Sequence, residues 1–175
     1  MAVITHRRHG RKIPSRQPSR PPIRYQDWDA SGWAGLIGAF AFLALQLGLT
    51  PMAIGGGPWE IIKAIAGVAL GSAAMVRPPG LRLIAIALAV LLPVALVYSR
   101  LLSSAISGRS RATGLILGAC AGLFLYWWHA YALSWLMPWL SLWRHPLSLV
   151  AHLAWGLSMA WVYQQFYAAH AFLRR

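Results

Sequence analysis

The sequence predicts an all-α integral membrane protein with four transmembrane helices and a short re-entrant or interfacial helix after the first. Hydrophobic residues make up 58% of the 175 residues and charged residues only 11%, whereas a soluble domain carries roughly 25% charged residues. Apolar runs of about 20 residues, the length that crosses a bilayer, recur along the chain. Glycine, proline and basic residues separate these runs, which indicates one bundle of membrane helices.

Residues 1–28 differ in composition from the rest of the chain. They are rich in Arg, Ser and Pro without apolar periodicity, which predicts an irregular cytoplasmic arm ahead of a transmembrane bundle at 29–175. Much of the net charge of +13 lies in this arm, so we expect it to contact anionic lipid or an acidic protein surface rather than nucleic acid. The basic residues concerned are Arg7, Arg8, Arg11, Lys12, Arg16, Arg20 and Arg24.

The four predicted spans lie at 33–54, 81–102, 113–137 and 147–166. Asp29 or Ser31 could cap the first span, and Pro93 predicts a kink in the second. A short basic loop at 107–111 follows the second span, and a tight turn at 138–146 separates the last two. The apolar run after the arm is too long for a signal peptide.

The segment 59–76 is short for a span and follows a Gly-rich break at 55–57. It could cross, re-enter or lie at the interface, and the distribution of basic residues favours a segment that does not cross. In that arrangement the loop at 107–111 and both termini lie on one side of the membrane. Because short loops rich in Lys and Arg stay in the cytoplasm, we expect both termini to be cytoplasmic.

Three motifs together resemble a family of small four-span bacterial membrane proteins. The matching residues are Gly56, Gly57, Pro58 and Trp59 in a Gly-rich Pro-Trp turn, Pro138 and Trp139 after the third span, and His152, Leu153 and Gly156 in the fourth. The resemblance covers about residues 32–166 and implies a multi-pass protein of the bacterial inner membrane. Some members carry a sodium/proline symporter label, but such transporters are built from larger inverted repeats. The resemblance therefore implies a topology and no activity.

Small residues recur at four-residue spacing in three predicted helices. They are Gly114, Gly118 and Gly122, then Gly67 and Gly71, and finally Gly156 and Ala160. Residues four apart share one helix face, and small side chains let membrane helices approach closely. The faces predict packing within the bundle, and contact with another subunit is the alternative.

His129, Tyr131 and His152 are the polar candidates inside the predicted membrane region. At 1.5 Å per residue, His129 lies about 12 Å from the end of its helix and His152 about 9 Å from the start of the next, so antiparallel packing puts them at similar depth. They could form structural hydrogen bonds, handle protons or a substrate, or ligate a haem or metal. The family tends to have Asn where this chain has His129, which argues against a ligand.

Five tryptophans cluster near the end of the third span, at positions 127, 128, 135, 139 and 143. Trp prefers the headgroup layer of a membrane, so we interpret them as a boundary belt, with a quinone or porphyrin groove as the alternative. Cys120 is the only cysteine, which excludes an intrachain disulfide and a CxxC metal site.

The function most consistent with these features is a small structural or accessory membrane protein that packs against a larger membrane complex. The acidic residues are Asp27, Asp29 and Glu60 alone, so we expect no catalysis, no metal and no cofactor. One alternative is a carrier or channel with its polar site at His129, Tyr131 and His152. A second alternative is a haem- or quinone-binding electron-transfer subunit.

Overall fold

The computed structural model describes residues 27–173, apart from the side chains of residues 53–54 and 170–173. Within that range every regular element is a helix, so the all-α class is confirmed. The long helices are α1 (Trp28–Ile54), α3 (Leu81–Ile106), α4 (Arg111–Trp127) and α6 (Pro146–Leu173). The short ones are α2 (Pro58–Leu70), the 3-10 helix η1 (Gly71–Ala74), the π-helix η2 (Trp128–Leu133), α5 (Ser134–Leu136) and the 3-10 helix η3 (Pro138–Trp143). The seven basic residues expected to bind lipid or a partner lie outside the described residues.

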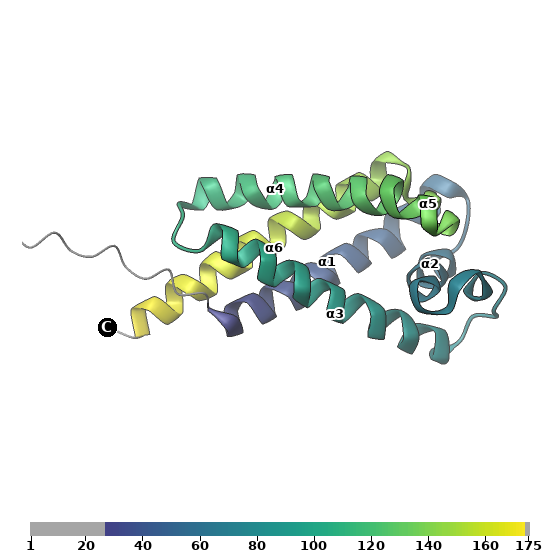
Figure 1. The fold of residues 1–175 in the computed structure, drawn as a ribbon, viewed down its shortest axis with the longest axis horizontal. Coiled ribbons are helices and arrows are strands. Elements are labelled where there is room, and N and C mark those ends of the chain that lie inside the picture. Colours follow the sequence, from purple (N-terminus) through teal and green to yellow (C-terminus); the bar gives the residue numbers. More distant parts are fainter. Residues whose placement is uncertain (1–26, 174–175) are drawn as a thin grey trace, which may run out of the picture.

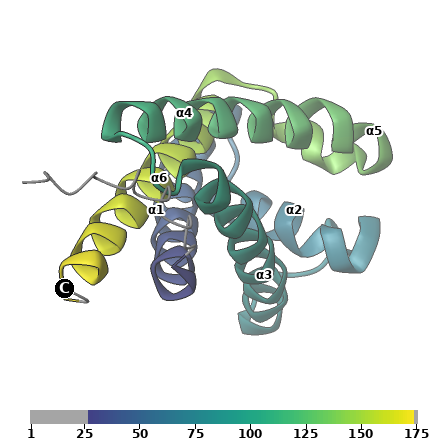
Figure 2. The ribbon, with the colours of Figure 1, turned by 60° about the vertical axis from the view of Figure 1, so that its left-hand side comes forward.

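Helix α6 is the central element of the bundle. It packs along α1 on one side and along α4 on the other (Figure 1). Helix α3 rests instead on α1 and α2, and makes few contacts with α4 although a short loop joins them. Figure 2 shows α3 and α4 diverging from that loop. The bundle is therefore close-packed around α6 and open between α3 and α4.

Helix α2 is shorter than the hydrocarbon core of a bilayer is thick. Its 13 residues span about 20 Å at 1.5 Å per residue, against a hydrocarbon core of about 30 Å. The turn at 55–57 before it and residues 75–80 after η1 lie at the same end of the molecule as 137–145 (Figure 1). The start of α1, the loop 107–110 and the far end of α6 lie at the opposite end.

Three helical stretches of the described chain are long and apolar enough to cross a membrane: Trp28–Met52, Leu81–Ile106 and Arg111–Leu136. The predicted fourth span, now part of α6, is not among them. Its helix carries His152, Gln164 and Gln165, which lower its mean hydropathy. His152 is completely buried in the bundle, whereas Gln164 and Gln165 are half-buried and bond to Ser110 and Arg111 at the start of α4.

Several helix boundaries differ from the predicted ones because of local caps. Helix α1 begins at Trp28 rather than residue 33, since the Asp27 carboxylate accepts a hydrogen bond from the Ala30 N–H at 3.0 Å. Neither Asp29 nor Ser31 is the cap. The helix ends at Gly55, whose φ of 69° is the left-handed geometry that glycine favours. Helix α6 continues to Leu173, beyond the predicted end at 166.

Candidate functional site

His129 and His152 meet in the interior of the bundle. His129 lies in η2 and His152 in α6, and Nδ1 of His129 is 3.2 Å from Nε2 of His152. Nδ1 of His152 is 2.7 Å from the carbonyl oxygen of Ser148. A carbonyl only accepts, so His152 donates from Nδ1. The site is therefore a directional pair of imidazoles that ends on a backbone carbonyl.

Ser148 extends the polar chain to α1, a connection that the sequence reasoning missed. Its hydroxyl accepts a hydrogen bond from Nε2 of Gln46 at 2.6 Å, and Thr50 donates to the amide oxygen of Gln46. All three side chains are completely buried. Gln46 and Thr50 inside an apolar run could have predicted this connection, because an amide in a membrane helix needs a hydrogen-bond partner.

His129 occupies a π-helix, which widens the backbone turn around it. The widened turn leaves the Ala130 carbonyl to accept from the Nε–H of Arg144 at 2.7 Å and from the Ser134 hydroxyl, also at 2.7 Å. Arg144 also donates from Nη2 to Ser134 Oγ at 2.6 Å. Such π-helical turns occur frequently at functional sites. This one depends on an arginine from the following turn, which no local sequence pattern indicates.

Tyr131, the third predicted polar candidate, lies apart from the histidine pair. Its ring is 45% exposed and stands edge-on to Tyr126, with 5.9 Å between the ring centroids. The guanidinium of Arg144 lies 5.3 Å from the Tyr131 ring. Tyr131 therefore contacts Arg144 rather than the two histidines.

His145 lies in the turn before α6 and caps that helix, since its Nδ1 accepts a hydrogen bond from the Ser148 N–H at 3.3 Å. Burial lowers the pKa of His145, because water that would solvate the charged ring is excluded. A neutral ring suits this role, because only an unprotonated Nδ1 can accept the bond.

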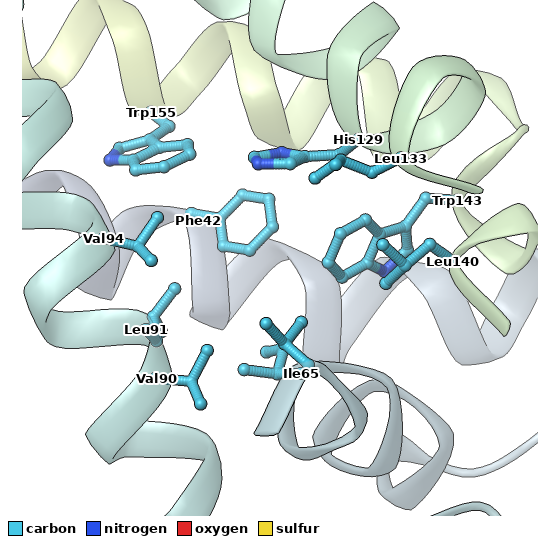
Figure 3. A pocket seen from close by; sticks show the side chains of 11 residues that line it. Phe42, Ile65, Val90, Leu91, Val94, His129, Leu133, Leu140, Trp143 and Trp155 are labelled. Carbon is cyan, nitrogen blue, oxygen red and sulfur yellow. The ribbon is translucent and has the colours of Figure 1, made fainter. Parts of the chain in front are cut away.

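Aromatic rings surround the histidine pair and border a small hollow. Phe42, Trp143 and Trp155 each stand within 6.4 Å of an imidazole, centroid to centroid. The hollow has a volume of about 100 Å³, and its walls are apolar except for His129 and the two indoles. In Figure 3 the His129 ring lies above Phe42, between Trp155 on the left and Leu133 on the right.

The tryptophan belt is only partly present as predicted. Trp127, Trp128 and Trp135 are exposed, the last at 84%. Trp143 is buried in the core, and Trp139 lies over α2 with its Nε1 2.6 Å from where a Gly67 methyl would be. Trp143 packs against Phe42 and the two histidines, whereas Trp139 fits over α2 because Gly67 has no side chain there.

The small residues of α4 and α6 lie against each other. A methyl group at Gly118 would stand 2.6 Å from the Gly156 carbonyl oxygen and 2.7 Å from Ala160 Cβ. One at Gly122 would stand 2.5 Å from the His152 carbonyl oxygen, and the Gln164 side chain covers Gly114. Gly71 does not pack: it ends α2 at a φ of 67° with open space around it. The α4 face is thus occupied within the chain.

The turn motif is a surface feature. The glycines at 55–57 are exposed, and a methyl group at Gly57 would meet nothing within 4 Å. Pro58 starts α2 directly after Gly57, as suits a residue without an N–H at the first helical position. Trp59 is half-buried, and Pro138 begins η3.

The residues at this site offer little to a metal. The described part of the chain contains no group of three or more His, Cys, Asp or Glu side chains placed to hold an ion. Three of the four ring nitrogens of the histidine pair form the hydrogen bonds described above. One nitrogen, Nε2 of His129, is left for a ligand.

Comparison of the chain with protein-family models, with curated proteins and with solved structures found no match. We therefore infer the function from the fold and from the geometry of the site.

Proposed function

We propose that the chain is a small non-enzymatic integral membrane protein that serves as an accessory subunit of a larger membrane assembly. In this proposal α6 is the fourth transmembrane helix, beside the three apolar ones. Its polar residues Ser148 and His152 are completely buried. The resemblance and the basic loops favour the bacterial inner membrane with both termini in the cytoplasm.

The observation that carries the proposal is a hollow between α3 and α4. It measures about 190 Å³, and its lining is apolar: Tyr98, Leu101, Leu102, Ala121, Phe124, Leu125, Gly156 and Met159. Leu101 is 62% exposed and Phe124 56% exposed. Membrane helices associate mainly by close packing of side chains, so this hollow suits a bulky side chain from a partner's transmembrane helix.

The polar interior favours this function over a carrier or channel. Gln46, Ser148 and the two histidines bond to one another and to the backbone, as expected of groups that hold a bundle together. The two hollows inside the bundle have apolar walls rather than a polar path. A hollow of about 100 Å³ is also too small for a porphyrin, which disfavours haem.

Native mass spectrometry after gentle extraction in a polymer that retains lipid tests the proposal. We expect the chain to appear with another membrane protein in fixed stoichiometry. Ala121→Trp should fill the hollow and abolish this assembly. Ile116→Trp is the matched control, because Ile116 is 63% exposed on the same helix and does not line the hollow. A wild-type chain that appears only as a monomer would overturn the proposal, as would an intact assembly with Ala121→Trp.

A further inference from the structure

The hydrogen bonds of the histidine pair determine whether Nε2 of His129, the ring nitrogen that they leave unused, carries a proton. His152 is completely buried, and a charged ring there without a counter-ion would be costly. A neutral His152 that donates from Nδ1 must accept at Nε2, so His129 donates from its own Nδ1. His129 lines an apolar hollow and none of the described acidic residues pairs with it, so its ring is neutral as well, and its Nε2 carries a lone pair and no proton.

This lone pair has no protein partner, although its ring lines the hollow of about 100 Å³. Both hydrogen-bonding atoms of His152 are used within the chain, and none of the described residues bonds to Nε2 of His129. Trp143 stands beside His129, with 5.8 Å between the ring centroids. Its indole N–H is likewise buried without a partner. No open space reaches this nitrogen or that of Trp155, so among the described residues Nε2 of His129 is the unpaired hydrogen-bonding atom left to the hollow.

The size and walls of the hollow limit what can fill it. An apolar cavity of about 150 Å³ accepts a benzene molecule, so this hollow takes one ring edge or the end of a chain. A water molecule needs two to four polar partners, whereas this hollow offers the single acceptor of His129, since its other walls are apolar and the indole nitrogens of Trp143 and Trp155 are closed off from it. Val68 of α2, at the rim, is 41% exposed, which opens the hollow towards lipid.

We propose that this hollow binds the hydroxyl-bearing end of a lipid-soluble molecule, with the hydroxyl donating to Nε2 of His129. A hydroxyl supplies the donor that this acceptor lacks. The apolar body of the ligand lies along α3 and leaves between α2 and α3. Its hydroxyl comes either from a phenol or hydroquinone ring or from an aliphatic alcohol. This site is separate from the hollow between α3 and α4, because the two hollows share no lining residue.

The test uses the full chain in nanodiscs of dioleoyl phosphatidylcholine, with ¹⁵N-labelled histidine observed by NMR. The probes are 4-hexylphenol, its methyl ether 4-hexylanisole, and 1-dodecanol. We expect saturable binding of a hydroxyl probe to shift the His129 Nε2 signal, which is assigned by its loss in His129→Gln. The ether lacks the donor, so it should bind about tenfold more weakly, as one lost hydrogen bond implies.

Two valine substitutions on α3 provide the matched control. Val94→Phe fills the hollow and should abolish the shift, whereas Val97→Phe changes a side chain that is 58% exposed and should leave it unchanged. Binding of hexylphenol alone supports a phenolic ligand, and binding of dodecanol alone supports an aliphatic one. The proposal is overturned if neither probe shifts the signal, if the ether binds as tightly as the phenol, or if Val94→Phe binds like wild type.

Discussion

At the scale of single residues, Ser148 joins the two halves of the buried polar chain. Its hydroxyl oxygen accepts a hydrogen bond from the Gln46 amide, and its backbone carbonyl accepts one from the His152 ring. Lipid offers a buried donor or acceptor no alternative partner, so each group is stable only while the next one is in place. The Gln46 amide thus depends on the Ser148 hydroxyl, whereas the His152 ring depends on the Ser148 backbone carbonyl.

Ser148→Ala tests this dependence, because it removes the hydroxyl and keeps the carbonyl. The Gln46 amide then loses its acceptor, and we expect the free energy of unfolding in detergent to fall by about 1–3 kcal/mol. The double variant Gln46→Leu with Ser148→Ala should recover most of the loss, because both polar partners are replaced by apolar groups. Ser104→Ala is the control, since Ser104 bonds only within its own turn. Equal stability of the single variant and wild type would contradict the argument.

At the scale of helices, close approach between α4 and α6 brings the histidines together. The glycines of α4 let its backbone reach the carbonyls of Gly156 and His152. The π-helical turn then carries His129 inward, and Arg144 holds that turn through the Ala130 carbonyl. The described residues provide no acidic partner for Arg144 in this arrangement, so a backbone carbonyl, a hydroxyl and the face of Tyr131 take its place.

Gly118→Ala tests the packing of α4 on α6. The added methyl would stand 2.6 Å from the Gly156 carbonyl oxygen, so the helices must separate at a cost of about 1–3 kcal/mol. Gly32→Ala is the matched control, because a methyl at that position of α1 meets nothing within 4 Å. We expect thermal unfolding in detergent at a lower temperature for Gly118→Ala alone. Identical melting of the two variants would show that the approach is not tight.

At the scale of the whole molecule, the sequence predicts the number and order of the long helices better than the site. Glycine and proline breaks predict where helices end, and helical rise predicts that His129 and His152 have similar depth. The π-helix, the inward turn of Trp143 and the link through Ser148 depend on contacts between distant segments, so no local pattern predicts them. Helix α6 contains buried polar residues because α1 and α4 flank it. Mean hydropathy alone does not predict such a position.

The last prediction concerns the membrane topology of α2 and α6. We expect α2 not to cross the membrane and α6 to cross it. Single cysteines in a Cys120→Ser background are labelled in spheroplasts with a maleimide that does not cross membranes. If α2 does not cross, cysteines at Gly56 and Pro79 both react from outside, and so does one at Ser141, at the same end of the molecule (Figure 1).

The opposite end supplies the other half of the pattern. If α6 crosses and the termini are cytoplasmic, cysteines at Arg109 and Ala168 react only after the membrane is opened. Both positions are exposed, so a lack of labelling in spheroplasts reports the membrane rather than burial. Labelling of Gly56 without Pro79 would show that α2 crosses, and equal labelling of Ser141 and Ala168 would remove α6 from the spans. An inverted pattern would keep the four spans and place the termini outside, since α1 and α3 would still join the two ends.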